Sequence, residues 1–126
     1  MSKRLLIIDN DTEVLNMMQE ALVYEGFEVK ISKNADDIFK VMDEYQPDLI
    51  MIDYILDGIN GGEICHDIKV NPETCHIPVI IVSAYSKVIL SLGSYRSDAF
   101  LAKPFGLDEM IKQVNKLLAA ATLQAC

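Results

Sequence analysis

The chain has 126 residues, of which 51% are hydrophobic, and its formal net charge is −8 at pH 7. This length and apolar content can build one hydrophobic core but hardly two, so we expect a single domain over residues 1–126. The acidic surplus repels phosphate backbones and anionic lipid headgroups, which argues against direct binding to nucleic acid or membranes.

The N-terminal residues do not resemble a secretory leader. Basic Lys3 and Arg4 precede an apolar run, residues 5–8, that Asp9 interrupts after four positions. Such a run is too short for a signal peptide or a membrane span. The three cysteines are odd in number and widely spaced, which predicts reduced thiols. We therefore expect a cytoplasmic protein.

Short apolar runs alternate with segments of helical periodicity along the chain. This alternation is typical of consecutive β-α units, which build a parallel sheet covered by helices on both faces. It predicts an α/β fold with a doubly wound, central five-stranded parallel sheet. The expected strands cover residues 5–8, 27–31, 49–52, 79–82 and 100–102.

The helical segments show apolar residues at spacings of three and four. Asp11 is the expected N-cap of the first helix, and the second is expected to begin near Asn34. Asn71 and Pro72 end the third, because a proline excludes the helical conformation before it. A short apolar segment at residues 88–92 follows the fourth strand. The last helix is expected to carry its apolar face at Leu107, Ile111, Val114 and Leu118.

Polar residues stand at the carboxyl ends of four expected strands: Asp9 with Asn10, Asp53, Ser83 and Lys103. Ligands bind at this edge in open α/β sheets, so we expect these side chains to converge. A carboxylate cluster can hold Mg²⁺, which keeps waters that a phosphate can replace. Lys103 would neutralise charge on a transferred phosphoryl group and the Ser83 hydroxyl would donate to it. Asp53 would then be the nucleophile.

Several stretches of the chain together resemble the receiver domain of two-component response regulators, and the chemotaxis regulators among them. Residues 47–53 resemble the phosphoacceptor strand of that family, and Gly58 and Gly61 resemble the loop that follows it. Residues 77–84 resemble its strand with the switch hydroxyl, and residues 103–105 its Lys-Pro-Phe sequence. The resemblance covers residues 4–120 and implies a (βα)5, flavodoxin-like three-layer sandwich.

The resemblance also implies a mechanism. A histidine kinase or histidine phosphotransfer protein would present a phosphohistidine, whose phosphoryl group moves to Asp53. Ser83 would then shift toward the phosphate, and Phe100, at the aromatic switch position, would turn into the vacated space. The family's Lys103-Pro104 peptide is expected to be cis, and Ala84 is expected to line the phosphate. The output would be an effector domain appended to this one or a separate protein, and a homodimer is conceivable.

The implied metal site is Mg²⁺, or Mn²⁺, held by Asp9, Asn10, Asp53 and the backbone carbonyl of Ile55. Asn10 stands where the family usually has a second acid. Because a lost charge near 4 Å is worth roughly 1 to 4 kcal/mol, we expect weak metal binding. Asp11 is an alternative ligand, although its position favours the N-cap.

Two bulky residues, Ile55 and Tyr85, occupy the variable positions beside the phosphorylation chemistry. Neither residue offers a carboxylate or an amide to orient an attacking water, which predicts a long-lived acyl phosphate. The domain is therefore expected to be at most a weak autophosphatase and not an enzyme.

Two other interpretations remain open. One is an interaction module on the same fold that works without phosphorylation. The other starts from residues 9–12, which resemble the opening motif of haloacid-dehalogenase-like phosphatases, with Asp9 as nucleophile.

Overall fold

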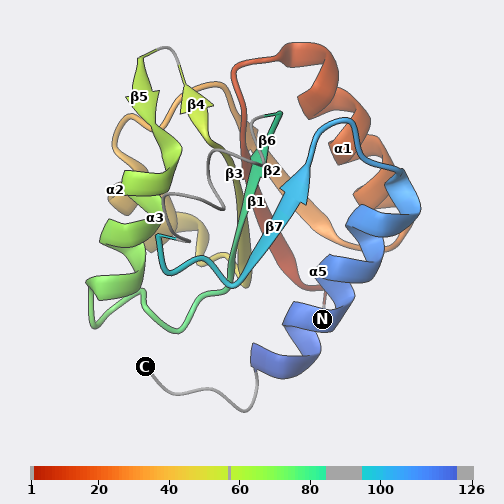
Figure 1. Ribbon diagram of the computed structural model, residues 1–126. Helices are drawn as coiled ribbons and strands as arrows, with labels where there is room; N and C mark the ends of the chain where they lie inside the picture. The colour runs from red at the N-terminus through yellow and green to blue at the C-terminus, as the bar shows by residue number, and fades with distance from the viewer. Residues whose placement is uncertain (1, 57, 85–94, 122–126) are drawn as a thin grey trace.

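A parallel five-stranded sheet forms the centre of the molecule (Figure 1). The computed structural model describes residues 2–56, 58–84 and 95–121. The strands are β1 (Arg4–Ile8), β2 (Glu28–Ser32), β3 (Leu49–Asp53), β6 (Val79–Ser83) and β7 (Ala99–Ala102). They lie in the order β2-β1-β3-β6-β7, and every neighbouring pair is parallel. The five predicted strands and their parallel arrangement are confirmed.

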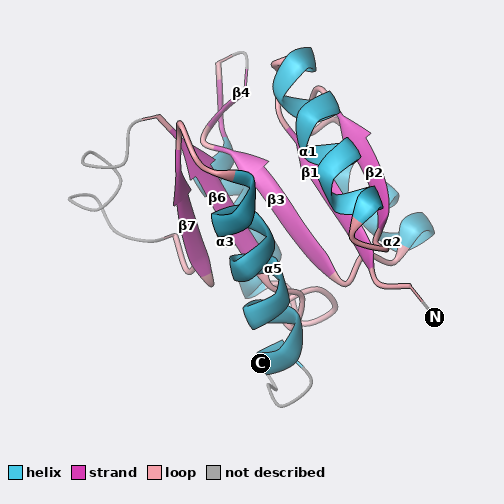
Figure 2. Cartoon of the chain, turned by 90° about the vertical axis from the view of Figure 1, so that its right-hand side faces the viewer, coloured by secondary structure: helices cyan, strands magenta, loops and turns pink. Residues whose placement is uncertain are grey.

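Helices cover both faces of this sheet (Figure 2). They are α1 (Thr12–Tyr24), α2 (Ile38–Tyr45), α3 (Gly61–Val70) and α5 (Leu107–Ala121). Successive strand residues point to opposite faces: Leu5 packs in one buried cluster with Met18 of α1, whereas Leu6 packs in a second cluster with Ile68 of α3. Helices α1 and α5 therefore cover one face and α2 and α3 the other, as the predicted three-layer sandwich requires.

The second helix begins later than predicted. Its first residue is Ile38, not a position near Asn34, and Asp37 before it has a left-handed conformation with φ 54°. The Asn34 Oδ1 accepts a hydrogen bond from the Asp36 amide at 3.1 Å. Asparagine and aspartate side chains offer the backbone such turn contacts in place of helical ones. These residues therefore form a turn, and the helix starts after it.

The glycine-containing segment after Asp53 forms a small antiparallel hairpin that was not predicted. Strand β4 (Ile55–Leu56) pairs with β5 (Ile59–Asn60). Gly58 in the turn has φ 85°, a conformation that costs glycine little. Two-residue strands are too short to show an alternating pattern, which is why the sequence indicated only a turn.

Two other predictions concerned the C-terminal half. The apolar segment at residues 88–92 lies outside the described residues. In α5 the buried side chains are Met110 and Val114. Leu107 was predicted to lie on the apolar face of this helix, but it is 39% exposed and lies outside the core.

The cysteines differ in state. Cys65 is free and buried in α3, and burial raises the pKa of its thiol to about 12. Cys75 is disulfide-bonded, so the prediction of reduced thiols is wrong at this position. Across the described part of the chain, no helix combines the length and apolar character needed to cross a membrane.

One ion pair joins three elements at the amino edge of the sheet. The Lys69 Nζ of α3 lies 2.9 Å from the Asp98 Oδ2 and also donates to the Ile77 carbonyl at 3.1 Å. The same Asp98 oxygen accepts the Val79 amide at 2.8 Å. The two charged side chains are only 12% and 18% exposed, so they are weakly screened.

We expect Asp98→Ala to lower the free energy of unfolding by about 2 to 3 kcal/mol, because it leaves a buried amide and a largely buried ammonium without their acceptor. Urea unfolding would measure the change. Asp67→Ala, which removes a carboxylate that is 67% exposed on α3, should change stability by less than about 0.5 kcal/mol. Equal effects of the two substitutions would contradict a stabilising role for the Asp98 contacts.

Candidate functional site

The predicted polar residues meet at the carboxyl edge of the sheet. Asp53 is the last residue of β3, and Asp9 directly follows β1, whose Ile8 is paired with Ile52. Ser83 ends the next strand, β6, and Lys103 follows β7. The strand order reverses between β1 and β3, the place where open α/β sheets form a ligand crevice.

Lys103 connects the two buried carboxylates. Its Nζ lies 2.8 Å from the Asp9 Oδ2 and 3.5 Å from the Asp53 Oδ1. Its backbone amide donates to the Ser83 carbonyl at 2.8 Å, which ties the end of β7 to that of β6. The Lys103–Pro104 peptide bond is cis, as the resemblance implied.

The electrostatics of this cluster centre on Asp53. Burial and the neighbouring Asp9 raise the pKa of Asp53 to about 6, although Lys103 and the Tyr54 amide act in the opposite direction. Burial lowers the pKa of Lys103, but its hydrogen bond to Asp9 and the charges of both carboxylates raise it by more. Two carboxylates thus share one ammonium, and the cluster carries a surplus of negative charge when both are ionised.

The three residues after β1, Asp9, Asn10 and Asp11, have different roles. Asp9 is only 2% exposed, and its Oδ1 accepts the Asp11 amide at 2.9 Å. Asp11 caps α1: its Oδ1 accepts the amides of Glu13 and Val14. The predicted N-cap is therefore confirmed, and this oxygen is engaged in the helix. Asn10, between the two acids, is exposed.

The chemistry of these donors fits a divalent cation. Asp9 and Asp53 supply carboxylate oxygens in a buried site whose negative charge Lys103 only partly balances. Oxygen ligands of this kind suit Mg²⁺, which also retains several waters. No group of three or more His, Cys, Asp or Glu side chains able to hold a metal occurs among the described residues. A cation here therefore depends on neutral oxygens for its remaining ligands.

Ser83 and Phe100 lie toward the same face of the sheet. Ser83 is 1% exposed. Ile81, two residues before it in β6, is paired with Phe100 of β7, and both belong to the cluster on the α2 and α3 side. Because residues two apart in a strand share a face, the Ser83 side chain points to the side on which Phe100 packs.

The remaining predicted residues surround this cluster. Ala84 is exposed and lines an apolar pocket of about 390 Å³ with Val14, Met17, Lys103, Pro104 and Phe105. Ile55 lies in β4, and the residue is 45% exposed. Tyr85 lies outside the described residues.

Sequence reasoning missed an aromatic contact next to Asp53. The rings of Tyr54 and Tyr95 lie 6.1 Å apart, and their hydroxyl oxygens are separated by 3.5 Å. A side chain on Gly62 would meet the Tyr95 ring at 2.5 Å, and one on Gly61 would overlap the Asp53 carbonyl oxygen. Gly61 is thus required by the close approach of the Asp53 backbone, whereas a side chain on Gly62 would displace the Tyr95 ring. Only Gly61 could be suspected from the sequence, since the distant Tyr95 gave no local signal.

The sequence is similar to those of known proteins. The protein named "Probable transcriptional regulator ycf29" from Pyropia yezoensis is 30% identical over 126 residues, which cover 98% of this chain and 57% of that protein. The DNA-binding dual master transcriptional regulator RpaA of Synechocystis is 30% identical over 117 residues, covering 91% and 48%. This chain thus spans about half the length of these curated relatives.

A solved structure and a family model also match this chain. The response regulator TrrA of Thermotoga maritima, solved in complex with Mg²⁺-BeF, is 29% identical with a TM-score of 0.81, covering 91% of this chain and 98% of that one. Residues 5–115 match the family described as the response regulator receiver domain. Since this match extends over most of the residues, the chain belongs to the receiver domain family of two-component response regulators.

Proposed function

We propose that Asp53 is the phosphoacceptor of this receiver domain and takes its phosphoryl group from the phosphohistidine of a histidine kinase or a histidine phosphotransfer protein. One observation carries this proposal: the Lys103 ammonium lies 2.8 Å from Asp9 and 3.5 Å from Asp53 at the carboxyl edge of the sheet. A nucleophile, a second carboxylate and a cation from three separate strands therefore meet at one point.

The transfer is a substitution at phosphorus. A carboxylate oxygen of Asp53 forms a bond to phosphorus, the phosphorus–nitrogen bond of the phosphohistidine breaks, and the electron pair leaves with the imidazole. With a pKa of about 6, Asp53 is about nine-tenths ionised at pH 7 and hence competent as a nucleophile. Lys103 would offset charge on the phosphoryl oxygens, and the Ser83 hydroxyl would donate a hydrogen bond to one of them.

Receiver domains bind Mg²⁺, and this chain offers ligands for it. Asp9, Asp53, the Asn10 side-chain oxygen and the Ile55 backbone carbonyl would hold Mg²⁺ or Mn²⁺. When bound, the cation supplies charge neutralisation for the transferred group. Asn10 contributes an amide where a carboxylate would bind more strongly, so binding should be weak.

The readout would be steric. Ser83 would move toward the phosphate and release space on the face where Phe100 packs. Phe100 has no hydroxyl, so its position would depend on the available volume and not on a hydrogen bond. Phosphorylation would thereby favour one of two packings of the last strand and helix.

We assign residues 1–126 to a single receiver domain that acts in the cytoplasm and does not itself bind nucleic acid. The relatives named above are transcriptional regulators about twice as long. An effector domain or a separate output protein would therefore read the switched surface. Receiver domains are signalling domains, and we expect no turnover beyond slow loss of the chain's own phosphoryl group.

Intact-mass spectrometry after incubation with acetyl phosphate and Mg²⁺ tests the phosphoacceptor. We expect one added phosphoryl group, absent from Asp53→Asn and from a sample without metal. Loss of label in Asp9→Asn but not in Asp53→Asn, with turnover of phosphate esters, would instead indicate the phosphatase chemistry of Asp9. Failure to label under any metal would leave an interaction module that works without phosphorylation.

The acyl phosphate should persist well beyond seconds at neutral pH. Ile55 presents an aliphatic side chain, which cannot orient a water for attack on phosphorus. Labelled protein, freed of donor by rapid desalting, would be followed by mass spectrometry, with Ile55→Gln as the comparison. A lifetime of seconds in the parent chain would contradict this expectation.

A further inference from the structure

A disulfide lies at the amino edge of the sheet, opposite to the edge that carries the phosphorylation residues. Cys75, in the loop between α3 and β6, is disulfide-bonded. The chain contains three cysteines, and Cys65 is free. Within one chain, only Cys126 can then be the partner of Cys75. Cys126 lies outside the described residues, so this pairing is inferred from the count of cysteines and from the place where α5 ends.

The loop that carries Cys75 is held in place by its own hydrogen bonds. The amides of Thr74 and Cys75 donate to the Asn71 carbonyl oxygen at 3.0 and 2.8 Å. The Ile77 amide donates to the Thr74 carbonyl oxygen at 3.0 Å. The Thr74 Oγ1 donates to the Ile68 carbonyl oxygen of α3 at 2.8 Å, which fixes the loop to that helix. Cys75 therefore has a defined position, and it is partly exposed to solvent.

Helix α5 runs to the same edge of the sheet as this loop (Figure 1). Ala121, the last residue of α5, and His76, the neighbour of Cys75, both line a small pocket of about 160 Å³. Cys126 lies five residues beyond Ala121. An extended chain of that length spans up to roughly 17 Å. The end of the described helix is thus close enough for Cys126 to reach Cys75.

Cys65 has the opposite properties. It is 0% exposed in α3, and burial raises the pKa of its thiol to about 12. The thiolate is the reactive form of cysteine, and a buried thiol of this kind is inert. Cys65 therefore serves as an internal control for any redox chemistry at Cys75.

We propose that Cys75 and Cys126 form a reversible redox pair, whose oxidation fastens the chain beyond α5 to the loop between α3 and β6. Disulfides in a reducing compartment are usually transient and redox-sensing. The proposal rests on the cytoplasmic location given under the proposed function, but not on phosphotransfer to Asp53. Because α5 belongs to the surface through which phosphorylation would be read, oxidation would restrain that surface from the opposite edge of the sheet.

The oxidation is a thiol–disulfide exchange with a low-molecular-weight disulfide. A thiolate of the pair attacks a sulfur of the reagent, which forms a mixed disulfide and releases one reagent thiol. The second protein thiolate attacks the protein sulfur of the mixed disulfide, which closes the bond between Cys75 and Cys126 and releases a second reagent thiol. The protein loses two protons and two electrons, and the reagent gains them as two thiols.

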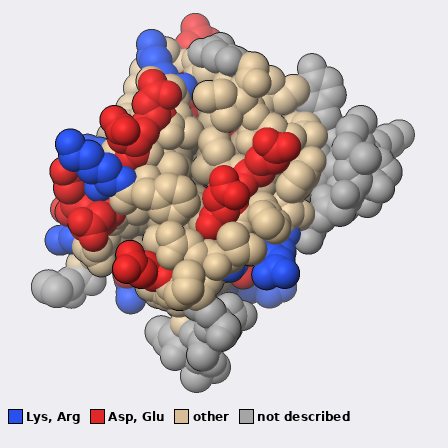
Figure 3. Space-filling view, turned by 90° about the vertical axis from the view of Figure 1, so that its left-hand side faces the viewer, with Lys and Arg blue, Asp and Glu red and all other residues tan. Residues whose placement is uncertain are grey.

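The reagents for the test are uncharged: bis(hydroxyethyl) disulfide as the oxidant and mercaptoethanol as the reductant. Carboxylates are spread over the face formed by α2 and α3 (Figure 3), and the net charge is −8, so an anionic reagent would be repelled. After acid quenching, intact-mass spectrometry of the oxidised chain should show the loss of two hydrogens, which mercaptoethanol restores. Peptide mapping without reductant should recover residue 75 linked to residue 126.

Two variants separate the pair from the buried thiol. Cys126→Ser should abolish the mass loss and instead retain one reagent as a mixed disulfide on Cys75. Cys65→Ala should lose two hydrogens as the parent chain does, and circular dichroism would verify that both variants are folded. Asp53→Asn should also respond like the parent chain, so a failure of phosphotransfer would not affect this result.

Amide hydrogen exchange tests whether the bond fastens the helix. Exchange in the last turn of α5 should slow about tenfold or more on oxidation of the parent chain, because the tether suppresses opening of the helix end. Cys126→Ser should show no such change under the same conditions. Equal exchange rates in the two states would overturn the proposal, as would a chain that keeps its mass at every ratio of the reagents, or a disulfide-linked dimer in place of the intrachain bond.

Discussion

Replacing Asn10 with aspartate is expected to tighten Mg²⁺ binding about fivefold or more. The substitution adds a carboxylate beside Asp9 at a place where the existing negative charge is shared with Lys103. A charge about 4 Å from a cation contributes roughly 1 to 4 kcal/mol, depending on the effective dielectric constant, which corresponds to a factor between about five and a thousand. Calorimetric titration with Mg²⁺ at constant ionic strength would measure the change.

The control for this experiment is Asn115→Asp on the exposed side of α5, which adds the same charge far from the proposed ligands. It should leave the Mg²⁺ affinity within about twofold, because distant surface charges are screened by salt. If Asn10→Asp binds Mg²⁺ no better than this control, then residue 10 is not a ligand and the proposed coordination must be revised.

Asp53→Asn is expected to stabilise the metal-free protein by about 2 kcal/mol at pH 7.5. The pKa of Asp53 is raised from 3.8 to about 6 in the folded state, mainly by burial and then by Asp9. Folding therefore favours protonated Asp53, and this contribution is complete below pH 3.8 and lost as the pH rises through 6. Asparagine has nearly the same shape as aspartate but stays neutral at every pH, so the variant does not lose stability as the pH rises.

Urea unfolding in the presence of a chelator would test this at several pH values. The stability difference between Asp53→Asn and the parent chain should be largest above pH 6 and shrink steadily toward pH 4. Mg²⁺ should then stabilise the parent chain more than the variant, because it favours the ionised carboxylate. Asp67→Asn, at an exposed position, serves as the control and should show no comparable pH dependence. A difference that does not change with pH would exclude the carboxylate charge as its cause.

The centre of the sheet could be predicted because β3 and β6 are buried on both faces. Each of the five residues of β3 is buried, so a continuous apolar run marks the strand and its end. The start of α2 could not be predicted in this way, since Asn34 and Asp37 suit a helix cap and a turn equally well. The β4–β5 hairpin was missed for a different reason: with two residues per strand, tertiary context and not periodicity determines it.

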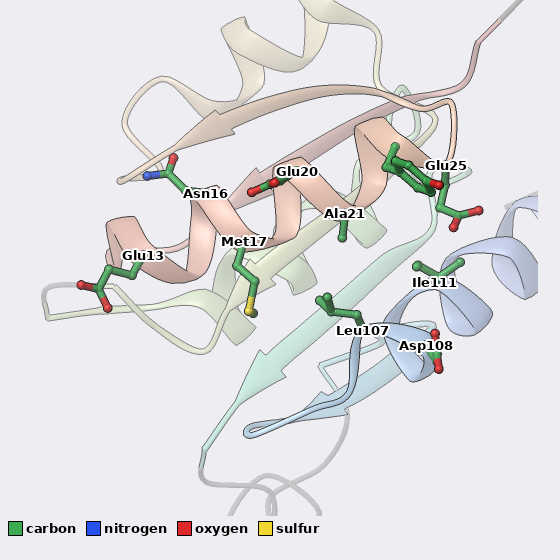
Figure 4. Close-up of a pocket in the computed structure, with 10 residues that line it drawn as sticks. Glu13, Asn16, Met17, Glu20, Ala21, Glu25, Leu107, Asp108 and Ile111 are labelled. Carbon is green, nitrogen blue, oxygen red and sulfur yellow. The ribbon is translucent and has the colours of Figure 1, made fainter.

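The residues of the site could be predicted from the sequence more fully than the residues around them. Asp9, Asp53, Ser83 and Lys103 each follow a recognisable strand, and parallel strands bring their carboxyl ends together. Exposure of Leu107 could not be foreseen, because the apolar spacing of α5 does not reveal how far α1 extends over it. That exposed leucine lines a concave surface between α1 and α5 (Figure 4). The helical pattern thus located the helix but not the exposed part of its apolar face.

The Tyr54–Tyr95 contact gives the molecule a built-in optical reporter. The chain contains no tryptophan, so tyrosine emission is not lost by energy transfer to an indole. Tyr54 directly follows Asp53, and its hydroxyl lies 3.5 Å from that of Tyr95. Any rearrangement at the end of β3 that separates the two rings should change the ultraviolet emission of the unmodified protein, so the site can be followed in real time without attaching a dye.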